Sequence, residues 1–218
     1  MELEEIPQSE ENKIDLSDKD IFTKIWTSPR LVFQFLNENY YDKNLYILMV
    51  LAGISSAFSR ASDKNMGDDY SLLTVLAICI IFGGLLGWLS YYIYAALLSW
   101  TGKWISGEGD TNSLLRMISY AMLPGIASLV LVVPEIAMFG NEIFQSNIDI
   151  YSSGLLSAIV YFASSTIRLI LGIWVIVLLV VGISEVQKLS IGMSILNMIL
   201  PILVIVLPIA LVIVLASS

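Results

Sequence analysis

The sequence contains no histidine and a single cysteine, Cys79, which lies inside a long apolar segment. A lone cysteine excludes an intramolecular disulfide, and a zinc site built from several Cys and His ligands is excluded with it. Ser-His-Asp and Cys-His catalysis are excluded because both need histidine. No Gly-rich phosphate loop, HExxH string or GxSxG string occurs. We therefore expect no catalytic residue, no cofactor and no metal, and a protein that is not an enzyme.

Charged residues are also scarce, at 14% of the chain against 57% hydrophobic residues. This composition leaves no room for a separate soluble domain of ordinary size. The net charge is −8, and ten of the nineteen acidic residues lie before residue 44. Residues 1–20 are acidic and poor in apolar residues, which predicts a solvated, disordered tail. We expect no nucleic-acid partner for this chain.

Long apolar stretches dominate the sequence after residue 44. They are Leu45–Ala61, Leu72–Trp100, Leu114–Pro134, Leu155–Ser184 and Ile195–Ala216. About 18 apolar residues in a helix cross the hydrocarbon core of a bilayer, and a backbone in lipid must satisfy its own hydrogen bonds. The sequence therefore predicts an all-α, polytopic membrane bundle of five transmembrane helices over residues 44–218.

Residues 21–43 connect the acidic tail to the first span. Ser28 followed by Pro29 is typical of a helix start, with a hydroxyl cap and a ring that already holds helical φ. One prediction is an amphipathic interfacial helix, with Trp26, Tyr40 and Tyr41 at the depth of the lipid headgroups. The alternative is a helix that packs under the bundle.

The distribution of Lys and Arg predicts the topology, because cytoplasmic segments carry an excess of them. With the N-terminus in the cytoplasm, Arg60 and Lys64 lie outside and Arg168 lies within a span. Eight basic residues then lie inside: Lys13, Lys19, Lys24, Arg30, Lys43, Lys103, Arg116 and Lys188. We expect the C-terminus to lie outside.

Small residues mark the predicted helix contacts. Gly53 lies in the first span, and Gly83 and Gly87 form a GxxxG step in the second. Such steps let helix backbones approach closely, either within one chain or in a homodimer. In the third span Pro124 follows Tyr120, and this proline is expected to kink or break the helix.

An ionisable side chain inside a bilayer is a functional candidate. Arg168 lies 17 residues before Glu185, which is about 25 Å along a helix. Glu135 lies 19 residues beyond Arg116, or about 29 Å by the same rise. In antiparallel helices both side chains reach similar heights, so we expect an Arg168–Glu135 ion pair. The alternative is an arginine that extends to the headgroups alone.

The order of parts resembles the Yip1-domain family of five-span membrane proteins, in its bacterial branch. The likeness covers roughly residues 22–215. Five segments or residues carry it: Ile25–Arg30 (IWTSPR), Gly53, Thr101–Gly109 (TGKWISGEG), Leu114–Pro124 (LLRMISYAMLP) and Gly182–Ser190 (GISEVQKLS). The resemblance implies a helical bundle with a cytosolic N-terminal region in a bacterial cytoplasmic membrane. Eukaryotic relatives are linked to Rab GTPases, but their Asp-Leu-Tyr-Gly-Pro string is absent here.

Two functions remain open at this point. The first is an adaptor or membrane-organising protein that acts through the lipid bilayer or an unidentified protein partner. Its candidate cytoplasmic surface consists of Lys103, Gly107, Gly109, Glu185 and Lys188. The alternative is a small-solute or ion transporter, which needs a polar cavity near the midplane. That cavity is expected to reach Tyr120, Arg168 and Asn197.

Overall fold

Every regular element in the computed structural model, which describes residues 15–151 and 154–217, is a helix. The α-helices are α1 (Asp18–Lys24), α2 (Pro29–Glu38), α3 (Leu45–Asp63), α4 (Leu72–Gly102), α5 (Thr111–Ala121), α6 (Leu123–Ala127), α7 (Leu129–Phe139), α8 (Leu155–Gln187) and α9 (Ile191–Ser217). Short 3-10 helices are η1 (Met66–Asp68), η2 (Lys103–Ile105) and η3 (Gly140–Phe144). The all-α prediction is confirmed.

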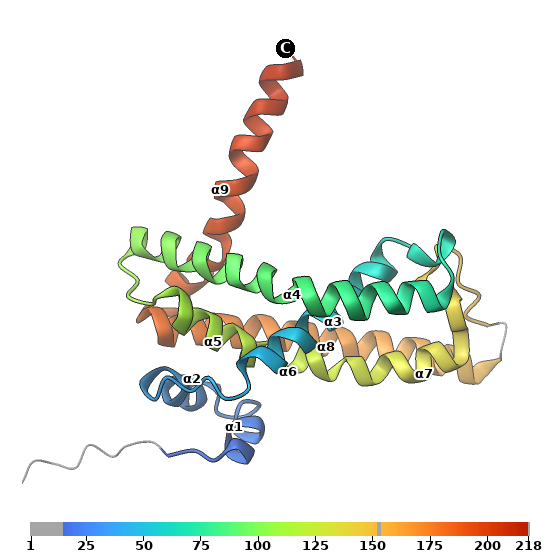
Figure 1. The fold of residues 1–218 in the computed structure, drawn as a ribbon, viewed down its shortest axis with the longest axis horizontal. Coiled ribbons are helices and arrows are strands. Elements are labelled where there is room, and N and C mark those ends of the chain that lie inside the picture. The colour runs from blue at the N-terminus through green and yellow to red at the C-terminus, as the bar shows by residue number, and fades with distance from the viewer. Residues whose placement is uncertain (1–14, 152–153, 218) are drawn as a thin grey trace, which may run out of the picture.

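Five helical segments are long and apolar enough to cross a membrane, as the sequence predicts. They are Leu45–Asp63, Leu72–Ile105, Thr111–Phe144, Leu155–Gln187 and Ile191–Leu215. The first four lie side by side in an elongated bundle (Figure 1). We call the end of the bundle that carries α1 and α2 the proximal end. The distal end carries the connections 64–71 and 140–151.

The segment before the first span packs under the proximal end. It forms α1 and α2, and α2 packs against α5 and α8. Val32, Phe33 and Leu36 are buried in this contact, whereas Trp26 stays exposed. Apolar burial therefore favours the packed arrangement, which is the second of the two alternatives. Pro29 is the first helical residue as predicted, but the Ser28 side chain makes no cap hydrogen bond.

The prediction of an acidic tail over residues 1–20 falls mostly on residues 1–14, which lie outside the described residues. The last part of that range is helical, since α1 begins at Asp18. Ser17 accepts a hydrogen bond from the Asp20 N–H at 3.2 Å, and the Asp20 carboxylate accepts one from the Ser17 N–H. This capping box supplies partners for N–H groups that a helix start leaves unpaired.

The third span is broken, as Pro124 predicts. α5 ends at Ala121, α6 holds Pro124 in its first turn, and α7 follows Ser128. The break allows α6 to pack against both α3 and α8. α7 continues past Pro134 to Phe139, so Glu135 is helical.

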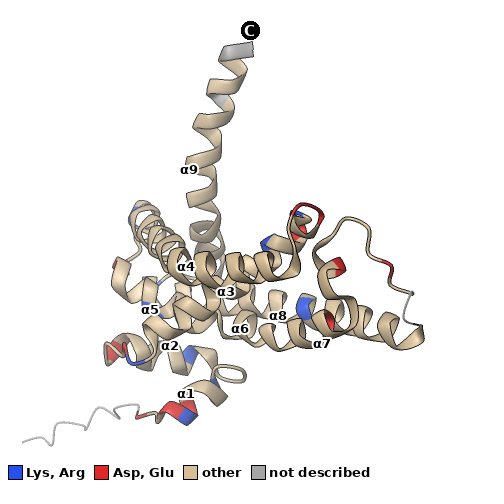
Figure 2. Cartoon of the chain, turned by 45° about the vertical axis from the view of Figure 1, so that its right-hand side comes forward, with Lys and Arg blue, Asp and Glu red and all other residues tan. Residues whose placement is uncertain are grey.

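The fifth span joins the bundle only through its first turns. Ser194, Asn197 and Pro201 are buried against the rest of the protein. From Ile205 to Leu215, every side chain that the structure describes is exposed. Figure 1 shows α9 leaving the bundle, and Figure 2 shows no charged residue on it. The bundle thus has four helices along its length, and most of α9 offers an apolar surface to lipid.

Candidate functional site

The predicted glycine residues join α3 to α4 within one chain. A Cβ atom at Gly53 would lie 2.3 Å from the carbonyl oxygen of Gly83 and 2.7 Å from the Cα of Gly87. Both neighbours are backbone atoms, so only glycine allows this approach. In the described structure the GxxxG step therefore packs against α3 of the same chain.

Serine hydroxyls hold α3 against the break in the third span. Ser55 donates a hydrogen bond to the Gly125 carbonyl oxygen at 2.7 Å, and Ser128 donates to the same oxygen at 2.6 Å. A carbonyl near a helix break lacks its usual backbone donor, and in lipid a hydroxyl is a suitable replacement. The sequence analysis did not identify Ser55. The nearby Pro124 is the signal that points to its role.

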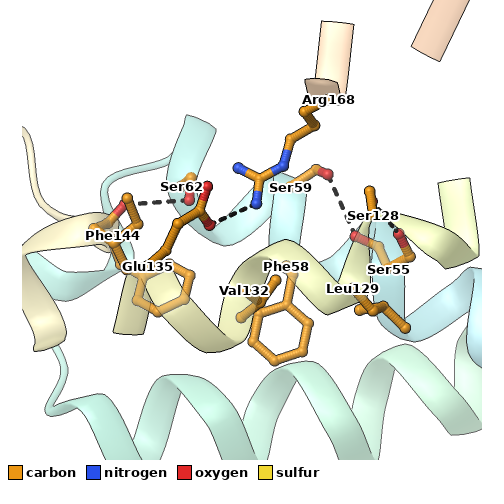
Figure 3. Close-up of a pocket in the computed structure, with 11 residues that line it drawn as sticks. Ser55, Phe58, Ser59, Ser62, Ser128, Leu129, Val132, Glu135, Phe144 and Arg168 are labelled. Atoms are coloured by element: carbon orange, nitrogen blue, oxygen red, sulfur yellow. Dashed lines mark hydrogen bonds and ion pairs between the residues drawn. The ribbon is translucent and has the colours of Figure 1, made fainter. Parts of the chain in front are cut away.

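Arg168 and Glu135 form the predicted ion pair. Arg168 Nη2 lies 2.6 Å from Glu135 Oε2, and Figure 3 shows the guanidinium extended from α8 toward the carboxylate on α7. Glu135 is only 3% exposed, whereas the Arg168 side chain remains about one-third exposed. Burying a carboxylate in an apolar environment is very costly unless a cation and hydrogen bonds compensate. Arg168 supplies that cation.

Two pockets of very different volume lie next to the ion pair. The pocket drawn in Figure 3 holds only about 10 Å³, which is roughly the volume that one water needs. A groove of about 380 Å³ lies on the other side, between α3, α6 and α8. Its polar lining comes from Ser55, Ser56, Ser59, Arg60, Ser128 and Arg168. Most of the groove surface is nevertheless apolar, with Met122, Leu171 and Val175 among its lining residues, and its two charged residues are both arginines.

Tyr120 and Asn197 do not join Arg168 in one cavity. Tyr120 is fully buried at the proximal end, with its ring centroid 6.2 Å from that of Phe22. Asn197 is also fully buried, and its Oδ1 accepts a hydrogen bond from the Thr101 hydroxyl at 3.0 Å. Pro124 is buried in the helix break. The shared midplane cavity that a transporter predicts is not formed by these residues.

Gln187 connects three segments at the proximal end, and the sequence analysis missed it. Its side chain is completely buried; Nε2 donates to the Leu98 carbonyl oxygen at 3.0 Å, and Oε1 accepts from the Gly109 N–H at 2.8 Å. A Cβ atom at Gly107 would lie 2.5 Å from Oε1. Gly107 and Gly109 are thus packing residues, which corrects their assignment to the exposed surface. The cluster of glycines around residue 107 was the available signal.

The other residues of the predicted cytoplasmic surface lie at the proximal end. Lys103 and Lys188 are exposed. Glu185 is largely covered, and its carboxylate lies 3.3 Å from the Lys188 ammonium and 3.8 Å from the Arg30 guanidinium. The exposed Trp104 ring packs edge-on against Trp100 at 4.8 Å between centroids. This surface is aromatic and carries charges of both signs, since the exposed Glu108 and Asp110 lie on the same connection as Lys103.

The Asp18 carboxylate links α1 to the segment that precedes α3 through hydrogen bonds. It accepts hydrogen bonds from the Tyr41 hydroxyl and the Lys43 ammonium. The bonds from Lys43 and then Tyr41 hold the pKa of Asp18 below its ordinary value of 3.8. Burial, followed by the Asp18 carboxylate, raises the pKa of Tyr41. The proximal end is therefore held together by charge as well as by apolar packing.

Within residues 15–151 and 154–217, no three His, Cys, Asp or Glu side chains form a group that could hold a metal ion. No curated protein and no solved structure matches the chain. A family model does match: that of the Yip1 domain, over residues 23–213. The match covers α2, the first four candidate spans and the fifth as far as residue 213. The chain therefore belongs to the Yip1 domain family and is an integral membrane protein.

Proposed function

We propose that the chain is a non-enzymatic adaptor or membrane-organising protein whose proximal end binds a protein partner. In this proposal the chain lies in a bacterial cytoplasmic membrane, with the proximal end in the cytoplasm and the C-terminus outside. The charge distribution supports this orientation. Arg116 lies on α5, and Lys103 and Lys188 follow the ends of α4 and α8, near the basic residues of α1 and α2 at the proximal end. Arg60 and Lys64 lie at the end of α3 next to the connection 64–71 of the distal end.

The observation that carries the proposal is the packed proximal end. Ile21 and Ile25 of α1 and Val32 of α2 are buried in the same apolar cluster as α5 and α8 residues. Gln187 ties the connection at Gly109 to this cluster. A fixed surface of exposed aromatic and basic groups loses little conformational entropy when a partner binds. Trp and exposed cations are also frequent among residues that dominate binding energy.

The experiment is affinity capture of the tagged protein from mild detergent, with crosslinking. A deletion of residues 1–43 would remove core residues such as Val32, so point substitutions are the sharper choice. The proximal variant combines Trp104→Ala with Lys188→Gln. The distal control combines Tyr70→Ala with Lys64→Gln, which removes the same kinds of exposed group. Loss of a specific partner from the proximal variant alone supports the proposal, and equal capture by both variants contradicts it.

The orientation has its own test. Cys79 is buried, so a Cys79→Ala variant provides a background for single cysteines at the exposed positions Lys64 and Lys188. A membrane-impermeant maleimide should label Lys64→Cys in intact cells and Lys188→Cys only after lysis. The reverse pattern would invert the proposed topology.

One observation favours the second candidate, a transporter or channel for a small solute or ion. Two arginines, Arg60 and Arg168, line the groove between α3, α6 and α8. Its charge favours an anion. Chloride efflux from proteoliposomes tests this candidate. Efflux that Arg168→Gln abolishes would favour a channel, and efflux equal to that of protein-free liposomes would exclude chloride conduction.

A further inference from the structure

A second cavity lies at the proximal end, apart from the Arg168 groove. It has a volume of about 460 Å³ and lies between the first turns of α3 and α5 and the second half of α4. Exposed aromatic rings line its mouth: Tyr46, Trp88 and Tyr92. Tyr46 belongs to the first turn of a membrane span. Tyr and Trp concentrate at the membrane–water interface, so the cavity lies at headgroup depth.

The floor of the cavity carries a cation with an unused donor. Arg116 is only 4% exposed, and its Nε donates to Asp42 Oδ1 at 2.8 Å. Its Nη1 is buried and has no hydrogen-bond partner in the described structure. A buried, unsatisfied donor on a charged group is expensive, and such a group is a reason to look for a missing acceptor. The first turn of α5 lies beside it and adds N–H groups with partial positive charge.

The cavity can be opened without moving a helix. The Tyr40 ring lies over the guanidinium, with its centroid 5.6 Å from Arg116 Cζ. Tyr40 itself is largely exposed, so its ring can turn away from Arg116. An acceptor that enters the cavity then replaces a cation–π contact with a charge-assisted hydrogen bond.

The other charged residues of the cavity determine which charges a ligand must carry. Asp42 and Asp110 also line the cavity, so two carboxylates face one guanidinium. A simple anion would meet net negative charge, whereas a simple cation would leave Arg116 Nη1 unpaired. A ligand that carries both a phosphate and an ammonium satisfies both groups. The rings of Trp88 and Tyr92 add cation–π attraction for the ammonium.

We propose that this cavity binds the headgroup of a phospholipid with a phosphate and a terminal ammonium, such as phosphatidylethanolamine. The phosphate accepts from Arg116, and the ammonium lies near Asp110 among the aromatic rings. The acyl chains continue into the bilayer past Tyr46 and Met49. This site goes beyond the proposed partner binding and does not require it, because it faces lipid rather than the surface around Trp104.

The probe is short-chain dioctanoyl phosphatidylethanolamine, compared with dioctanoyl phosphatidylglycerol, on the delipidated full chain in detergent. Native mass spectrometry measures saturable binding. We expect phosphatidylethanolamine to bind about tenfold more tightly, since one charge-assisted hydrogen bond is at stake. Equal binding of the two lipids, or no saturable binding, would overturn the proposal.

Two matched pairs of variants identify the site. Asp110→Asn keeps a good helix cap but removes the charge. The ratio of the phosphatidylethanolamine affinity to the phosphatidylglycerol affinity should therefore fall toward one. Glu108→Gln removes a charge from the same connection outside the cavity and should leave the preference unchanged. Trp88→Ala should weaken binding several-fold, whereas Trp100→Ala on the same helix should not; these rings are 47% and 49% exposed. Identical behaviour within either pair would contradict the assignment.

Discussion

Gln187 of α8 and Gly102 of α4 touch so closely that a Cβ atom at residue 102 would lie 2.2 Å from Gln187 Nε2. The amide fills the space that side chains at Gly107 and Gly109 would also need. Three segments therefore meet around one buried polar side chain: α4, the 103–110 connection and α8. A separate hydrogen bond from Thr101 to Asn197 joins α4 to α9. A buried amide is stabilising only when its hydrogen bonds are made. Gln187 makes them with both of its polar atoms.

Replacing Gln187 should therefore destabilise the protein. Gln187→Ala leaves the Gly109 N–H without its acceptor and opens a cavity, which costs about 1–3 kcal/mol for the unpaired group alone. Thermal unfolding in detergent measures the loss. Gln34→Ala is the control, because Gln34 bonds only to the exposed Glu38 and should change stability little. Equal effects of the two substitutions would contradict the role given to Gln187.

The contact between α3 and α4 should not tolerate a methyl group. Gly53→Ala would place its Cβ against backbone atoms of Gly83 and Gly87, which cannot move without separating the helices. We expect a loss of about 1–3 kcal/mol, as for other overpacked sites. Gly172→Ala is the matched control, since a Cβ at that position of α8 meets nothing within 4 Å. The comparison fails if both variants melt at the same temperature.

The two partners of the ion pair should respond differently to neutralisation. Arg168→Gln leaves the buried Glu135 carboxylate without a cation, which costs about 3–5 kcal/mol for a broken buried pair. Glu135→Gln should cost less, because the partly exposed Arg168 can turn toward water or headgroups. The double variant should be more stable than Arg168→Gln alone. Exchanging the two charges should likewise restore part of the stability, and additive losses in a double-mutant cycle would argue against a coupled pair.

The docking of α1 should depend on pH through Asp18. The pKa of this carboxyl is lowered in the folded protein, so its stabilising effect is complete above the ordinary value of 3.8. That effect is lost as the pH falls through the lowered pKa. Hydrogen exchange of the α1 amides measures it. Asp18→Asn should remove most of the dependence; the remainder comes from Asp20, whose pKa is lowered by hydrogen bonds from Ser17. An unchanged pH profile in this variant would be inconsistent with the assignment.

The sequence predicts local properties of this chain well. Apolar length alone identifies the five candidate spans. The fixed rise of a helix was enough to bring Arg168 and Glu135 to similar heights, although the count from Arg116 to Glu135 crosses the break at Pro124. Gly53, Gly83 and Gly87 were predicted as packing residues because close approach of two membrane helices requires small side chains at the contact.

Long-range contacts were not predictable in the same way. The Gln187 side chain accepts a hydrogen bond from the Gly109 N–H across 78 positions, and Arg116 pairs with Asp42 across 74. The hydrophobic periodicity of a sequence does not indicate which distant element packs against such a side chain. The departure of α9 from the bundle was also missed, because an apolar helix has the same sequence pattern whether it faces lipid or protein. The packing of α2 remained open for this reason too.

The most direct test of the proposed function is photo-crosslinking in living cells. A benzophenone amino acid is placed at Trp104 of the proximal end or at Tyr70 of the distal end, both of which are exposed. The proposal predicts one discrete protein adduct from position 104, absent from position 70 and lost in the Lys188→Gln background. Adducts of equal yield from both ends, or none from position 104, would contradict an adaptor that works through its proximal end.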